Sequence, residues 1–172
     1  SDLDNYASFY QVTLLSLSLS VDQSSLVFGN LIPGDIFTNF TKATTTTNYP
    51  NGYTLAVSDN TAGSDSPLLR QSTSTRIADY SGTIASPTLW TIGTGFGICV
   101  FSGAGKDTSK WGTGTVYDSQ FNKYAGVPQN ASSAVVYTKN GAPTAGDEVD
   151  VGYKLVVSNS QMTGNYQGDV VY

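Results

Sequence analysis

Hydrophobic and polar residues alternate most clearly near the start of the chain, in the stretch TLLSLSLSV from Thr13 to Val21. Successive side chains of a β-strand point to opposite faces, so a period of two predicts a strand with one apolar and one polar face. The polar face carries serines, and the apolar face carries Leu15, Leu17, Leu19 and Val21. We compare the strand patterns in the rest of the chain with this one.

Strand-like patterns recur toward the C-terminus, separated by turns rich in Gly, Pro and Asn. The clearest segments are 53–57, 149–157 and 166–172, and residues 26–28 predict a further short strand. Segment 36–47 contains a threonine run that favours a strand but is one-sided at best. Residues 89–93 and 96–101 predict a hairpin around the Gly-Thr-Gly turn at 93–95, and the glycine-rich segment 102–115 predicts a loop. No segment longer than ten residues has helical spacing.

Roughly nine to eleven short strands in one chain of this length predict an all-β fold, a single jelly-roll or Ig-like β-sandwich. We assign residues 13–172 to this domain. Residues 1–12, SDLDNYASFYQV, precede it as an extended N-terminal strand arm.

The arm has an unusual composition for a chain terminus, which is normally polar and frayed. From Tyr6 onward it alternates, with one face formed by Tyr6, Ser8, Tyr10 and Val12 and the other by Ala7, Phe9 and Gln11. Three aromatic side chains in such a segment indicate that it binds a surface. The acids before it, Asp2 and Asp4, lack the glycine and distal glutamate of an EF-hand calcium loop. We interpret them as solvent-exposed acidic residues at the start of the arm.

Composition points to a secreted or cell-surface protein, because only 12% of residues are charged and Ser, Thr, Gly and Tyr are abundant. The first residue, Ser1, suits a processed mature chain. The net charge of −5 and the absence of a basic stripe exclude nucleic acid as a partner and disfavour anionic membrane surfaces. No apolar run approaches 18 residues, so we expect no membrane span.

Candidate chemistry is sparse, and we expect no enzyme, no cofactor and no metal site. The chain has no histidine, and the lone Cys99 sits in an apolar run typical of a buried small hydrophobe. The sequence GAGKDTS at 103–109 departs from the P-loop pattern. The only tight acidic cluster, Asp147, Glu148 and Asp150, reads as solvated acids or a weak cation site, with Asp150 on the outward face of its strand.

Two features leave a carbohydrate-related role open. Trp90, Trp111 and the tyrosines have the character of a sugar-stacking platform, although core filling explains them equally well. Asn39 and Asn130 occupy glycosylation sequons, a short pattern that also occurs by chance.

Three patches resemble secreted surface β-sandwich domains of bacteria and archaea, in particular TasA/camelysin-like fibre subunits and donor-strand pilins. They are FGNLIPG at 28–34, NYPNGYTL at 48–55, and VGYK at 151–154 leading to GNY at 164–166. The resemblance implies a jelly-roll or Ig-like sandwich whose N-terminal strand completes the sheet of a neighbouring subunit. No metalloprotease motif accompanies it.

These observations together predict a structural subunit of an extracellular pilus or filament, polymerising head to tail with copies of itself. The donor residues we expect in the arm are Tyr6, Ala7, Phe9, Tyr10, Val12 and Leu14. The sequence does not assign the acceptor groove. The alternative is a monomeric cell-surface adhesion or carbohydrate-binding module with surface glycans as partners, in which the arm folds back and a ligand binds at the Trp111 loop.

Overall fold

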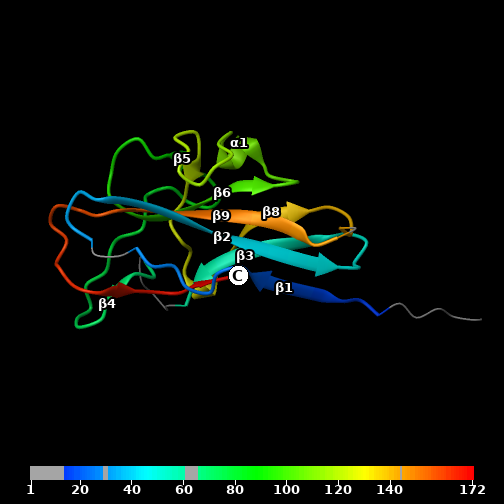
Figure 1. Ribbon diagram of the computed structural model, residues 1–172, viewed down its shortest axis with the longest axis horizontal. Coiled ribbons are helices and arrows are strands. Elements are labelled where there is room, and N and C mark those ends of the chain that lie inside the picture. Colours follow the sequence, from blue (N-terminus) through cyan, green and yellow to red (C-terminus); the bar gives the residue numbers. More distant parts are fainter. Residues whose placement is uncertain (1–13, 29–30, 61–65, 144) are drawn as a thin grey trace, which may run out of the picture.

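A computed structural model describes residues 14–28, 31–60, 66–143 and 145–172 of the chain. These residues form an all-β architecture of several antiparallel sheets, with one short helix and one 3-10 turn (Figure 1). The elements are β1 Leu17–Val21, β2 Ile36–Thr47, β3 Tyr53–Asp59, β4 Leu69–Arg70, β5 Thr88–Leu89, β6 Gly95–Gly103, α1 Thr108–Trp111, β7 Lys123–Tyr124, η1 Asn130–Ser132, β8 Ala134–Lys139, β9 Asp147–Val156, β10 Tyr166–Gln167 and β11 Val170–Val171. No helix in these ranges is long and apolar enough to cross a membrane.

The largest sheet contains four strands in the order β1-β2-β9-β6, all antiparallel to their neighbours. A three-stranded sheet, β11-β3-β8, lies against one face of it. The tyrosine hydroxyls of Tyr53 on β3 and Tyr137 on β8 reach across and donate to Asp147 on β9, at 2.7 and 3.0 Å. The all-β expectation is confirmed.

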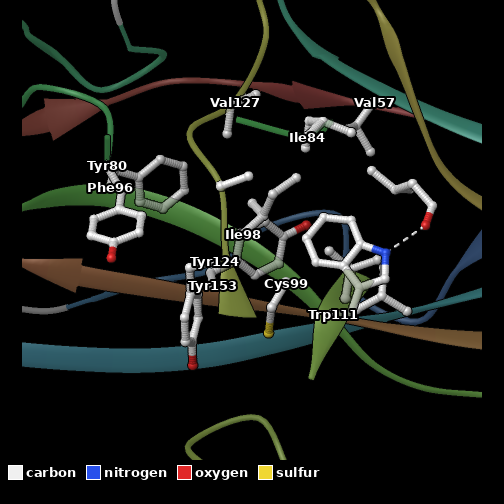
Figure 2. Close-up of a cluster of buried hydrophobic side chains, with 14 of the residues drawn as sticks. Val57, Tyr80, Ile84, Phe96, Ile98, Cys99, Trp111, Tyr124, Val127 and Tyr153 are labelled. Atoms are coloured by element: carbon white, nitrogen blue, oxygen red, sulfur yellow. Dashed lines mark hydrogen bonds between the residues drawn. The ribbon is translucent and has the colours of Figure 1, made fainter. Parts of the chain in front are cut away.

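The core fills the space between these sheets, as the alternation in 149–157 predicts. Val149, Val151, Tyr153 and Leu155 on β9 are all buried and face the three-stranded sheet. Figure 2 shows the neighbouring cluster, in which side chains of β6 such as Ile98 meet residues of the surrounding loops.

Over β9 and β6, the second face of the four-stranded sheet is also covered, which the sequence does not predict. Gly152, which shares the face of Asp150, is buried. A Cβ atom at this position would lie within 4 Å of Cys99, Phe101 and Tyr117. Trp90 and Tyr124, from the segment that contains β5 and β7, cover the same face over Lys154.

Several local predictions are wrong. The expected hairpin between residues 89–93 and 96–101 does not form, because β6 pairs with β9 and β5 pairs with β7. Residues 26–28 form no strand, although Leu26 and Phe28 pack against the core. The segment 102–115, expected to be a loop, contains α1, which Asp107 caps through hydrogen bonds from the backbone amides of Ser109 and Lys110.

Candidate subunit-interaction surface

The strand β1 forms one edge of the four-stranded sheet, and its register fixes the direction of its side chains. Leu17, Leu19 and Val21 lie directly opposite Thr47, Thr45 and Ala43 on β2. Directly opposed residues of an antiparallel pair share a face, and these three partners on β2 are buried. The aliphatic row of β1 therefore points to the same side of the sheet as the core.

The described chain covers this row only in part. Leu15, Leu17, Leu19 and Val21 are 62%, 69%, 41% and 37% exposed, and all five residues of β1 are exposed. Sheet edges are normally protected by charged side chains, proline or a bulge, and β1 carries none of these. An ordered stripe of aliphatic side chains on an unprotected edge is typical of a surface that binds another chain.

The strand β3 also has an unpaired side. β8 pairs with it from Tyr53 to Val57, whereas on the other side β11 pairs only with Ser58 and Asp59. Within the described ranges, no strand pairs with residues 53–57 on the side away from β8. Because β11 is antiparallel to β3 with Val171 opposite Ser58, Tyr172 comes next along this side of β3, beside Val57.

Tyrosine hydroxyls connect the three-stranded sheet to the core face of the four-stranded sheet. The Tyr53 hydroxyl, besides donating to Asp147, contacts Thr45, the residue opposite Leu19. Toward the other end of β1, the hydroxyl of Tyr172, just after β11, hydrogen-bonds with that of Tyr153 on β9. The contacts of Tyr53 and Tyr137 therefore place β3 and β8 against β2 and β9 of the four-stranded sheet. We call the exposed aliphatic row of β1 the open side.

Two side chains, Asn48 and Thr47, hold the segment that leads into β1. Asn48 donates from Nδ2 to the carbonyl oxygen of Leu14 at 2.7 Å and accepts at Oδ1 from the amide of Ser16 at 2.8 Å. The Thr47 hydroxyl adds a bond to the Ser16 carbonyl at 2.7 Å. These contacts extend the β1–β2 pairing by three residues, so the chain from Leu14 onward lies in line with β1.

The expected donor residues are mostly outside the described ranges. Tyr6, Ala7, Phe9, Tyr10 and Val12 fall there, and only Leu14 is placed, with 82% of its side chain exposed.

Of the two sequons, Asn39 is half-buried within β2, and the Thr41 that completes its motif is buried. Asn130 is exposed at the start of η1, where its backbone amide donates to Asp59.

The acidic cluster does not converge on one site, because consecutive strand positions alternate in direction. Asp147 faces the core, where it accepts hydrogen bonds from two tyrosines and lies 3.4 Å from the Lys139 ammonium; its expected solvation is wrong. Glu148 faces the other way and pairs with Lys42 at 2.8 Å. Burial, followed by the hydrogen bond to Asp147, raises the pKa of Tyr53. In the described ranges, no group of three His, Cys, Asp or Glu residues could hold a metal ion.

Neither tryptophan is arranged as a sugar platform. Trp111 is 1% exposed, and its indole donates to the carbonyl of Val136 at 2.8 Å (Figure 2), so its ring is not exposed for stacking on a ligand. Trp90 stacks on Tyr80 with ring centroids 3.9 Å apart, and the Lys154 ammonium lies 5.0 Å from its ring. Both indoles serve packing within the chain.

Cys99 is fully buried on β6, as expected. Burial raises the pKa of its thiol to about 12, so the thiol is neutral and unreactive in the folded chain.

Sequence reasoning located the apolar row but missed the unpaired side of β3 and the role of Asn48. The row has a direct signal, the strict Leu/Ser alternation, whereas the other two features depend on which strands become neighbours. Comparison with models of known protein families, with characterised proteins and with solved structures finds no match for this chain.

Proposed function

We propose that this chain is a structural subunit of an extracellular pilus or filament, and that it polymerises by donating its N-terminal strand to a neighbouring copy. In this proposal the strands form a jelly-roll or Ig-like sandwich, residues 1–12 are the donor arm, and the acceptor is the same domain of the next subunit. Because donor and acceptor are different surfaces, the contact is head-to-tail and extends without closing.

The observation that carries the proposal is the exposed aliphatic row of β1. An isolated domain gains nothing from an edge strand whose leucines face the core side yet remain 41% to 69% exposed. Covering them with a strand from another copy removes apolar surface from water and satisfies the free backbone groups nearby. The arm, with its aromatic residues, is attached directly to this strand.

Composition supports the extracellular placement. The chain has 8 basic and 13 acidic residues in 172, few charges for a soluble domain, while Thr, Ser and Tyr are frequent. Weak charge repulsion between copies favours a densely packed fibre.

Negative-stain electron microscopy of the purified chain tests the proposal, comparing the intact protein with a variant lacking residues 1–11. We expect filaments from the intact chain and single particles from the truncated one. A full-length control with Tyr6, Phe9 and Tyr10 replaced by serine keeps the arm's length and is expected to behave like the truncation. Matching circular dichroism spectra show that the domain remains folded in all three.

Filaments from both the intact and the truncated chain contradict donation by the arm. Monomers from all variants at every concentration contradict the filament subunit itself and favour the monomeric adhesion module.

A further inference from the structure

We propose that Asn130 is an N-glycosylation site of the folded chain, whose side-chain amide receives an oligosaccharide from a lipid-phosphate donor, and that the second sequon, at Asn39, receives none. The inference rests on the extracellular placement in the proposed function and not on the filament. Because the N-x-S/T pattern also occurs by chance, the surroundings of each sequon in the fold must distinguish them.

The transfer reaction sets the structural requirement. The asparagine Nδ2 attacks the anomeric carbon of the first sugar, and the new N–C bond replaces the bond from that carbon to the phosphate oxygen of the donor. The lipid phosphate leaves with its oxygen, and a base of the oligosaccharyltransferase takes the amide proton. The transferase also binds the hydroxyl of the third sequon residue, so both side chains must be accessible at the same time.

The sequon at Asn130 meets this requirement. Its three residues form η1, and Asn130, Ala131 and Ser132 are all exposed. The backbone amide of Asn130 donates to Asp59 at 3.2 Å, but among the described residues no hydrogen bond holds its side-chain amide. The backbone amide of Ser132 bonds to the carbonyl of Gln129 at 2.8 Å. A transferase therefore has to open a single exposed turn, a local change of the kind that folded proteins make at low cost.

The surface beside this turn has room for a sugar. The chain enters the turn at Pro128 and leaves it at Ala134, and both residues line a groove of about 400 Å³. Ile84 and Val127 add apolar side chains to its wall. The groove offers space and apolar surface to the C–H face of the first sugar, so a glycan attached here displaces no part of the core.

The sequon at Asn39 fails the same requirement. Asn39 lies within β2 directly opposite Tyr153 of β9, and its Oδ1 accepts a hydrogen bond from the amide of Phe40 at 2.9 Å. The hydroxyl-bearing Thr41 is only 3% exposed, on the core face of the sheet. Presenting both side chains to a transferase requires β2 to separate from β9, the longest pairing among the described strands. The folded sheet therefore shields this sequon.

Glycosylation of the purified, folded, full-length chain tests the inference. The chain is incubated with a lipid-linked oligosaccharide and a single-subunit oligosaccharyltransferase that requires only the N-x-S/T pattern. Intact-mass and glycopeptide mass spectrometry then report how many glycans are attached and where. Synthetic peptides of residues 36–44 and 127–135 serve as controls, and both are expected to be glycosylated because neither peptide has a fold.

We expect the intact chain to gain the mass of one glycan, located at Asn130. Asn130→Gln and Ser132→Ala are each expected to abolish the gain, whereas Asn39→Gln is expected to leave it unchanged. The matched control is Ser133→Ala, which removes an equally exposed hydroxyl next to the sequon but outside its pattern, and it is expected to retain the glycan.

An unmodified Asn130 in the folded chain, with the 127–135 peptide glycosylated, overturns the inference. Equal modification of Asn39 and Asn130 in the folded chain overturns it as well, because the fold would then not distinguish the two sequons. Both outcomes leave the filament proposal standing, since electron microscopy of the intact and truncated chains tests that proposal separately.

Discussion

The two edges of the four-stranded sheet are built in opposite ways. At the β6 edge, Phe96 bonds through its backbone to Ala78 and Tyr80, and Ile98 exchanges two backbone bonds with Ala125, all between 2.8 and 2.9 Å. Every residue of β6 from Gly95 to Phe101 is buried. At the β1 edge, every residue of the strand is exposed.

The contrast shows that the chain can cover one edge of its sheet with its own segments. It does so with short irregular segments, 78–80 and 125, which contribute backbone bonds without forming long strands. The β1 edge lacks this cover and also lacks the charges that protect exposed edges. Under the proposed function, the first edge serves folding and the second serves assembly.

The largest expected effect comes from charging the bare edge. Leu17→Lys combined with Leu19→Lys is expected to abolish filaments in electron micrographs, because two ammonium groups would have to be buried beneath the added strand. Monomer folding is expected to persist, since both side chains are exposed. The control, Ser18→Lys with Ser20→Lys, places the same charges on the other face of β1 and is expected to retain filaments; loss of filaments in both variants contradicts the assignment of the apolar face.

Truncation at the closed edge is expected to affect stability instead. Ile98 is fully buried, so Ile98→Ala should lower the free energy of unfolding by about 2–5 kcal/mol. Leu19→Ala at the open edge should change it by about 1 kcal/mol or less in a non-assembling, arm-deleted background. Urea denaturation followed by tryptophan fluorescence measures both values. Similar losses for the two variants would contradict the different roles of the edges.

The smallest effect concerns Asp150, midway between the edges, and depends on pH. Burial raises the pKa of this carboxyl, with the nearby Lys42 opposing the shift. The folded chain therefore binds this proton more tightly than the unfolded chain, so the contribution of Asp150 to stability falls as pH rises from the unfolded pKa through the raised folded value. Asp150→Asn should remove that fall. Urea denaturation of wild type and variant from about pH 3 to 6 measures the difference between their free energies of unfolding at each pH. If this difference does not change with pH, the raised pKa of Asp150 is contradicted.

Much of the fold was predictable because strong alternation and buried strands coincide. The alternation at 149–157 becomes the central strand β9, whereas the threonine-rich run 36–47, which lacks strict alternation, becomes β2 through its β propensity. The wrong hairpin at 89–101 has a physical cause. Its Gly-rich turn signal is local, whereas β6 gains more by pairing with β9 over eight positions, a partner distant in sequence.

The candidate site was only half predictable, for a similar reason. A period of two identifies the apolar face of β1, but the same pattern describes a strand covered on that face and one left bare. Which of these holds depends on which sequence-distant segments pack beneath β1, and the alternation carries no information about them. Trp111 illustrates the converse: the residue type fits a binding platform, but only the neighbouring carbonyl of Val136 shows that it is buried.

The two hydrogen bonds from Asn48 to the backbone of Leu14 and Ser16 have a mechanical consequence. Because they keep Leu14 in line with β1, tension applied through the arm acts along the axis of that strand. The five residue pairs between β1 and β2 then resist in shear and share the load, whereas a perpendicular pull would open them one at a time. A filament joined in this way would resist stretching at each junction by the combined strength of the β1–β2 ladder.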